Sequence, residues 1–255
     1  MELKIGIAKA AQHKRLESYE TVEIVERPQG KGYSVFLCDG HLNGKADKHV
    51  SNVCAKKLMD SIFDGVRDSV ALRAASDHIY SQYQGKAHVN VTLLSLDLST
   101  NTIVVSRNNP YPIYYYHGEE IRTWSNDSVS LGISHRVEPT INEITIDPDT
   151  IIIAASDGIF RAGRENGYDW DIPLHLLSIL EENYDPSAQG IAELILNQAV
   201  LLDSNRPNQD MTAVVFQITA DAPHPVMPIR KVSYDLPFNL DLYQFLDDPD
   251  NDPDD

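Results

Sequence analysis

Three carboxylates stand directly beside runs of apolar residues, which is where rigid strands can bring distant side chains together. Asp39 follows "YSVFLC", Asp157 follows "TIIIAAS", and Asp210 comes directly before "MTAVVFQI". Carboxylate oxygens are the hard ligands that Mg²⁺ and Mn²⁺ prefer in proteins. If the three strands meet at one edge of a sheet sandwich, their carboxylates predict a divalent-metal centre there.

Each of these signals has a simpler interpretation when it is taken alone. Asp39 and Asp157 are both followed by glycine, and an Asp-Gly pair after a strand is most often a turn. The recurrence of the pair, together with Asp210, favours the metal-site interpretation.

The segments that would position these carboxylates have the patterns of short strands and paired helices. Apolar spacing predicts two helices between the second and third strands, over about 50–62 and 72–83, and two more near 173–182 and after Ser187, a plausible N-cap. Turn residues separate the short β-branched and aromatic runs that predict strands. These runs cover residues 21–26, 33–38, 91–97, 102–107, 113–116, 143–146, 150–156 and 212–218. Grouped strands and paired helices indicate an α+β fold of antiparallel sheets covered by helices, not a regular βαβ alternation.

The composition is that of a globular protein with one hydrophobic core. Of the 255 residues, 42% are hydrophobic and 23% are charged, and the formal net charge is -17. This charge argues against nucleic acid and anionic membranes as partners, because both are bound by clustered Lys and Arg. No segment reaches 18 consecutive apolar residues, no leader pattern opens the chain, and two cysteines, Cys38 and Cys54, are too few for a disulfide framework. We therefore expect a cytoplasmic protein.

The last part of the chain differs in composition from the rest. Residues 220–255 hold nine acids and two bases and are rich in proline, which is typical of a solvated tail. Six of its apolar residues could instead dock on a surface, and both interpretations stay open. These six are Leu236, Phe238, Leu240, Leu242, Phe245 and Leu246. We expect one domain over residues 1–219 and an acidic C-terminal tail over 220–255.

The order of several motifs resembles a known family. These are "DGH" (39–41), "NPYPIYYY" (109–116), "LGI" (131–133), "IIIAASDGIF" (151–160) and "NQDMT" (208–212). In this combination they resemble the metal-dependent serine/threonine protein phosphatases of type 2C, and most closely the compact bacterial branch of the sporulation stage II E type. The resemblance spans about residues 1–218 and implies a four-layer αββα sandwich, with two antiparallel sheets between helix pairs.

The resemblance also implies roles for individual residues at a centre of two Mn²⁺ or Mg²⁺ ions. By position, Asp39 would bridge both ions, the Gly40 carbonyl would bind one, and Asp157 and Asp210 would hold the other. His41 would protonate the departing serine or threonine oxygen, although a solvated turn histidine is the alternative.

Three features depart from the family pattern. The family has a further acidic residue some twenty positions before the Asp-Gly pair, and both Glu17 and Glu20 are candidates; we prefer Glu20 because it directly precedes a strand. Leu42 stands where glycine is common. The phosphate-binding arginine of eukaryotic members has no clear match, although Lys14 and Arg15 are candidates.

The resemblance therefore implies a phosphoserine/phosphothreonine protein phosphatase that uses a metal-activated water. Its substrate would be a phosphorylated protein of bacterial signalling, such as an anti-sigma-factor antagonist, by family analogy alone. The alternative is a binding module with the same fold that recognises or sequesters a phosphorylated regulator with little turnover.

Overall fold

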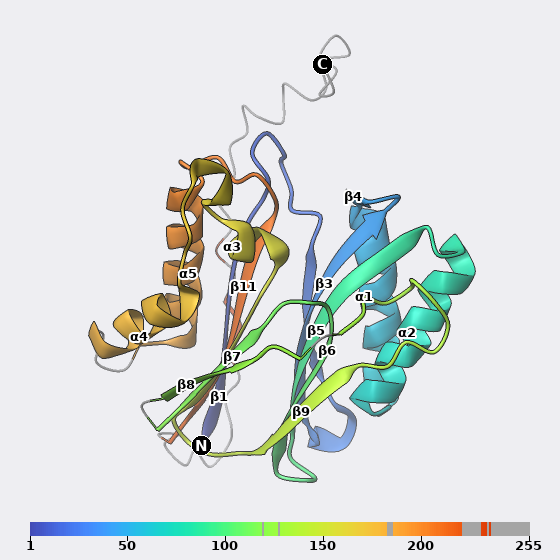
Figure 1. Ribbon diagram of the computed structural model, residues 1–255. Helices are drawn as coiled ribbons and strands as arrows, with labels where there is room; N and C mark the ends of the chain where they lie inside the picture. Colours follow the sequence, from blue (N-terminus) through green and yellow to red (C-terminus); the bar gives the residue numbers. More distant parts are fainter. Residues whose placement is uncertain (119, 127, 183–185, 221–230, 234, 236–255) are drawn as a thin grey trace. The chain divides into compact units, whose positions relative to one another are not determined.

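A computed structural model of the chain describes residues 1–220, except 119, 127 and 183–185, and also residues 231–233 and 235. The helices and strands follow one another in the order shown in Figure 1. The strands are β1 (Glu2–Ala10), β2 (Thr21–Glu26), β3 (Gly32–Leu42), β4 (Lys45–Ala46), β5 (Ala87–Asp97), β6 (Thr102–Asn108), β7 (Ile113–His117), β8 (Glu120–Trp124), β9 (Thr140–Thr145), β10 (Thr150–Ala155) and β11 (Met211–Thr219). The helices are α1 (Lys48–Phe63), α2 (Asp68–Tyr83), α3 (Asp157–Arg161), α4 (Ile172–Glu182) and α5 (Ala188–Leu202), with short 3₁₀ turns η1 (Pro28–Gly30) and η2 (Arg164–Asn166).

The strands form two antiparallel sheets that lie between pairs of helices. One sheet has the order β1-β11-β10-β7-β8, and the other has the order β2-β3-β5-β6-β9, with β4 paired to β3. Figure 1 shows α1 and α2 on the outer side of the second sheet and α4 and α5 on the outer side of the first. The predicted four-layer αββα sandwich is confirmed.

The burial of each strand follows from its place in these layers. β10 lies in the middle of its sheet, and all six of its residues, "TIIIAA", are buried. Ile152 and Ala154 pack between the two sheets, whereas Ile151, Ile153 and Ala155 pack against the helices. The edge strand β9 alternates half-buried and exposed residues instead.

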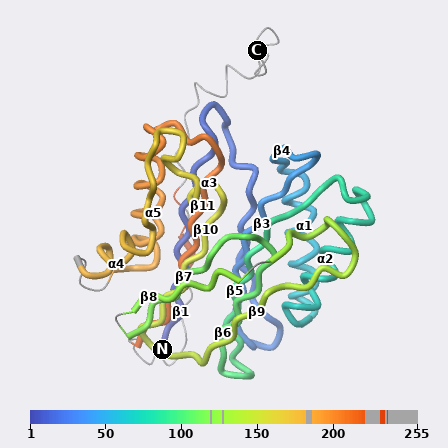
Figure 2. Tube along the Cα trace, in the orientation of Figure 1, coloured from blue at the N-terminus to red at the C-terminus, as the bar shows by residue number. Residues whose placement is uncertain are grey.

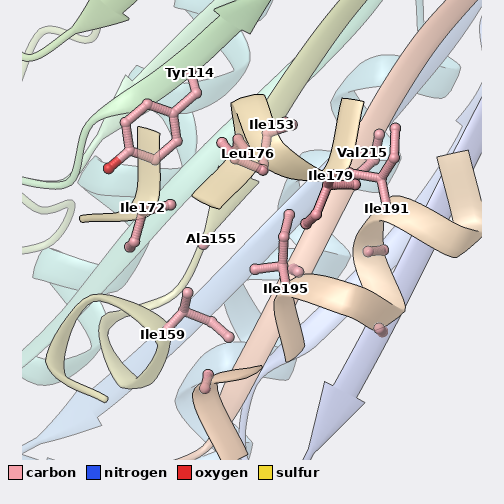
Figure 3. Packing of buried hydrophobic residues seen from close by; sticks show 14 of the residues in the cluster. Tyr114, Ile153, Ala155, Ile159, Ile172, Leu176, Ile179, Ile191, Ile195 and Val215 are labelled. Carbon is pink, nitrogen blue, oxygen red and sulfur yellow. The ribbon is translucent and has the colours of Figure 1, made fainter. Parts of the chain in front are cut away.

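Buried apolar side chains fill three spaces: between each sheet and its helices, and between the two sheets. Figure 3 shows the first of these, where Leu176 and Ile179 of α4 and Ile191 and Ile195 of α5 lie with Val215 of β11. Such packing makes the two sheets a rigid support for the side chains at their edges.

The predicted helices are present, and two begin at capping side chains. Asp47 accepts a hydrogen bond from the backbone N–H of Val50 at the start of α1. Ser187, predicted as an N-cap, accepts one from the N–H of Gly190 at the start of α5.

The predicted strands are also present, but the structure differs from the expectation in the end of β3 and in several elements that were not predicted. β3 does not end at Cys38; it continues through Asp39 to Leu42, because it pairs with β5 along its whole length. The strands β1, β4 and β8 and the short helix α3 were not predicted from the sequence. β1 mixes polar and apolar residues because it forms one edge of its sheet, where it pairs with β11, and Figure 2 shows these two strands side by side.

The chain divides into two units, Met1–Asp221 and Ala222–Asp255. Most of the predicted tail, including its six apolar residues, lies outside the described residues. Within the described part of the chain, no helix is long and apolar enough to cross a membrane.

A buried ion pair fixes the start of α2 to the second sheet. Arg27 donates hydrogen bonds to Asp68 and to the hydroxyls of Ser34 and Ser95, and all four side chains are buried. Burial raises the pKa of Asp68, and the Arg27 charge opposes this effect. The pair is therefore costly to break from one side only.

We predict that Asp68→Ala lowers the free energy of unfolding by about 3–5 kcal/mol, because it leaves a buried guanidinium without its carboxylate. Urea unfolding followed by circular dichroism measures this change. The matched control is Glu120→Ala, which removes the acid of the exposed pair with Arg122 and should change stability by less than about 1 kcal/mol. Equal effects of the two substitutions would contradict the role of the buried pair.

Candidate metal centre

Asp39 lies in the buried part of β3, opposite Asn90 of β5. Asp39 is only 8% exposed, and the amide nitrogen of Asn90 donates a hydrogen bond to its Oδ2 at 3.0 Å. Burial raises the pKa of Asp39, and the charges of Asp157 and Asp210 raise it further, whereas His41 and the Asn90 hydrogen bond oppose the shift. Asp39 is therefore a carboxylate held rigidly in a place that disfavours its charge.

Gly40 lies against the first turn of α1. Its N–H donates to the Ser51 hydroxyl at 2.8 Å, and its carbonyl accepts from the N–H of Asp47 at 2.8 Å. A Cβ on Gly40 would lie 2.4 Å from the Ser51 nitrogen. Only glycine allows β3 to come this close to the helix, and the second lone pair of the carbonyl is the one left for a ligand.

Of the two candidates for the N-terminal acid, Glu20 lies among the other carboxylates. It is 3% exposed, immediately before β2, and it accepts a hydrogen bond from the Thr212 hydroxyl. Burial, followed by the charge of Asp39, raises the pKa of Glu20 to about 8. Glu17 is exposed.

Asp157 is the first residue of α3, because the chain turns into a short helix directly after β10. Its Oδ1 accepts from Nε of Arg161 at 2.7 Å. The phenol of Tyr111 also interacts with Asp157: burial raises the pKa of Tyr111, and the Asp157 and Asp39 charges raise it further. Tyr111 therefore remains a hydrogen-bond donor at this edge of the site.

Asp210 ties the loop between β1 and β2 to the start of β11. Its Oδ1 accepts from the N–H of Gln12 at 2.8 Å, and its Oδ2 accepts from the N–H of Tyr19 at 2.8 Å and from Arg15 at 3.3 Å. Arg15 also lies over the ring of Tyr19. Of the two basic candidates, Arg15 therefore lies at the site, whereas Lys14 is exposed.

His41 lies in β3 and does not belong to a turn. Its ring stacks on that of His88, its cross-strand partner, with ring centres 4.8 Å apart. Its Nδ1 lies 3.5 Å from Oδ1 of Asp39. Burial, followed by the charge of His41, lowers the pKa of His88, so His88 provides a neutral surface for the His41 ring.

The fold thus brings Glu20, Asp39, Asp157 and Asp210 into one electrostatically coupled group, contributed by both sheets. These carboxylates fit divalent cations in donor chemistry, since all are hard oxygens. They also fit in charge, since burial and neighbouring acids disfavour the ionised forms of Glu20 and Asp39. As they stand, however, no three His, Cys, Asp or Glu side chains among the described residues surround one point as metal ligands would. Asp157 and Asp210 instead point their oxygens at protein donors.

Sequence reasoning missed several polar neighbours of this group. Asn90, Tyr111, Arg161, Ser156 and Thr212 contact or face the carboxylates. Asn90 was open to prediction in principle, since antiparallel pairing of two strands places one residue opposite Asp39. The others depend on how the two sheets face each other, which no local pattern reveals.

Comparison with known proteins gives a consistent result. The family model described as "Stage II sporulation protein E (SpoIIE)" matches residues 53–219, a range that contains Asp157 and Asp210. Stage II sporulation protein E of Bacillus subtilis (strain 168) is 23% identical over 220 residues, which are 86% of this chain and 26% of that protein. The chain thus spans about a quarter of that relative.

Two solved structures show the same fold. The PP2C phosphatase domain of SpoIIE from Bacillus subtilis, solved with a fragment of its regulatory domain, has a TM-score of 0.72 at 19% identity, over 86% of this chain and 64% of that one. The catalytic domain of the serine/threonine protein phosphatase PstP, in complex with two manganese ions, has a TM-score of 0.65 at 15% identity, over 85% of this chain and 98% of that one.

We predict that Asp39→Asn removes Mn²⁺ binding without unfolding the protein, because it deletes a charged oxygen and relieves repulsion among the carboxylates. Isothermal titration calorimetry with Mn²⁺ measures the loss, and we expect affinity to fall at least about 10²-fold. Asp60→Asn, which changes an exposed acid of α1, is the matched control. A variant at position 39 that binds Mn²⁺ as tightly as the parent would contradict the assignment.

A second prediction concerns the pH dependence of stability in EDTA. The pKa of Glu20 is about 8 in the folded chain and near 4.5 when unfolded, so the folded state binds more protons in between and stability falls as pH rises through this window. Glu20→Gln mimics the protonated form and should raise the free energy of unfolding at pH 8 by on the order of a few kcal/mol, with little gain at pH 4.5.

Urea unfolding at several pH values tests this, with the exposed Glu17→Gln as control. Parallel stability curves for the parent and Glu20→Gln would show that Glu20 does not titrate abnormally.

Proposed function

The chain belongs to the stage II sporulation protein E (SpoIIE) family, and we propose that it is a metal-dependent phosphatase of phosphoserine and phosphothreonine in proteins. The observation that carries this proposal is the gathering of four carboxylates, three of them buried, at the edge where both sheets of a PP2C-type fold meet. A group of like charges in this position is costly unless cations neutralise it.

We propose that Asp39, Asp157, Asp210, Glu20 and the Gly40 carbonyl hold two ions, Mn²⁺ or Mg²⁺. When bound, such ions acidify a water and neutralise phosphoryl oxygens. The pairing of β3 with β5 fixes the backbone of Asp39.

His41 is proposed as the general acid. Its ring is half-buried and stacked on the neutral His88, so it has a fixed orientation beside Asp39. A serine alkoxide is a poor leaving group and needs a proton as the ester bond breaks. Arg15, beside Asp210, is proposed to attract the phosphoryl group to the site.

The proposed substrate is a phosphorylated protein, and an anti-sigma-factor antagonist is the class that family analogy favours. A cytoplasmic location is proposed as well, since Cys38 and Cys54 are both buried free thiols. The alternative of a binding module with little turnover is less well supported, because a scaffold gains nothing from keeping these carboxylates together.

The direct test is release of phosphate from a phosphoserine peptide, measured with Mn²⁺, with Mg²⁺ and in EDTA. We expect release with a divalent ion and none in EDTA. No release with either ion from folded protein, on the peptide or on p-nitrophenyl phosphate, would overturn the proposal.

We predict that His41→Ala slows hydrolysis of the phosphopeptide by roughly 10²-fold, with a much smaller effect on p-nitrophenyl phosphate, whose leaving group departs without a proton. The measurement compares the losses in kcat on the two substrates at saturating Mn²⁺. The exposed His49→Ala is the control. Equal losses on both substrates would assign His41 to metal binding instead.

A chain ending at residue 219 should keep its activity on p-nitrophenyl phosphate within about twofold, because every proposed ligand precedes the cut. This tests the proposed boundary between the phosphatase domain and the tail. A truncated chain that is folded by circular dichroism but inactive on this small substrate would show that the tail completes the site.

A further inference from the structure

A polar relay reaches Asp39 from a loop that takes no part in the proposed chemistry. The hydroxyl of Ser130 donates to Oδ1 of Asn90 at 2.6 Å, and Nδ2 of Asn90 donates to Oδ2 of Asp39 at 3.0 Å. Asn90 is 9% exposed and Asp39 is 8% exposed. The bond between Asn90 and Asp39 is therefore buried, where a hydrogen bond is stronger than on the surface, and the bond from Ser130 is partly buried.

The direction of this relay is fixed by its chemistry. The amide of Asn90 turns its NH₂ toward Asp39 and its oxygen toward Ser130, and an amide oxygen can only accept hydrogen bonds. The Ser130 hydroxyl must then be the donor. Without that hydroxyl, the Asn90 oxygen loses its partner and the amide is free to rotate away from Asp39.

The backbone on either side holds both ends of the relay in register. Val89 and Leu131 exchange two backbone hydrogen bonds, at 3.0 and 2.9 Å. This antiparallel pairing places Asn90 of β5 opposite Ser130 of the loop. The side chain of Asn108 also donates to the carbonyl of Val129 at 3.0 Å. The "LGI" motif at 131–133 therefore has a structural role, because its Leu131 holds the loop against β5.

We propose that Asn90 and Ser130 are positioning residues for the metal centre, which fix the rotation of the Asp39 carboxylate. Asn90 occupies one lone pair of Oδ2, while Oδ1 lies toward His41, 3.5 Å from its Nδ1. This inference rests on the proposed function, since it gives the relay a task only if Asp39 holds a metal ion. Hydrogen-bond partners of metal-binding carboxylates set both the orientation and the affinity of the site.

A purely structural role would have a different signature. If the relay only satisfied buried polar groups, its removal would lower the stability of the protein and leave the Mn²⁺ affinity of the folded molecules unchanged. A positioning role requires the affinity to change, and requires a conservative variant that keeps the hydroxyl to restore it.

The experiment measures the Mn²⁺ dissociation constant of the full chain by calorimetry, with free Mn²⁺ counted by electron paramagnetic resonance. The variants are Asn90→Leu, Ser130→Ala and Ser130→Thr, and folding of each is checked by circular dichroism. The control is Ser106→Ala, which removes a fully buried hydroxyl of the same sheet that has no hydrogen-bond partner among the described residues.

We expect Asn90→Leu to weaken Mn²⁺ binding by roughly 10–100-fold and Ser130→Ala by roughly threefold or more, with Ser130→Thr and Ser106→Ala within about twofold of the parent. If Asn90→Leu does not fold, the Mn²⁺ affinity of Ser130→Ala still tests the relay, because Ser130 is only half-buried and its substitution should not prevent folding. Binding by Ser130→Ala equal to that of the parent would overturn the relay and leave the proposed function intact. A parent chain that binds no Mn²⁺ would overturn both.

Discussion

Mutual repulsion among buried carboxylates is the constraint on which the rest of this structure depends. Glu20 and Asp39 are almost fully buried, and burial raises the pKa of both. The charge of Asp39 raises the pKa of Glu20 further, and the charges of Asp157 and Asp210 raise that of Asp39. Apolar residues of similar size at these positions would give a more stable fold, so stability alone does not explain the carboxylates. The proposed cations would offset this cost.

The architecture opposes this repulsion with rigid backbone and many donors. Asp39 is fixed by the pairing of β3 with β5 and Asp210 by its place at the start of β11, while Gly40 brings β3 against α1. Donors from the loop between β1 and β2 hold Asp210, and the Thr212 hydroxyl holds Glu20. The site is thus preorganised by packing far from the carboxylates, as three separate apolar clusters indicate.

The sequence predicted those parts of the molecule that depend on local pattern. The strands around Asp39 and Asp157 and the helix capped by Ser187 follow from residue type and spacing. The extension of β3 beyond Asp39, the edge strand β1 and the His41–His88 stack do not, because they result from pairing between distant segments. For the same reason Asn90, Tyr111 and Arg161 became visible as neighbours of the site only in the folded chain.

The central claim is that the four carboxylates form one centre for two divalent ions. The most direct test is a crystal structure of the chain grown in saturating Mn²⁺, with anomalous diffraction measured at the manganese absorption edge. We expect two anomalous peaks among Glu20, Asp39, Asp157 and Asp210, with the Asp39 carboxylate contacting both. A map with no peak at these residues, or with manganese bound elsewhere and Asp39 still hydrogen-bonded as now, would contradict it.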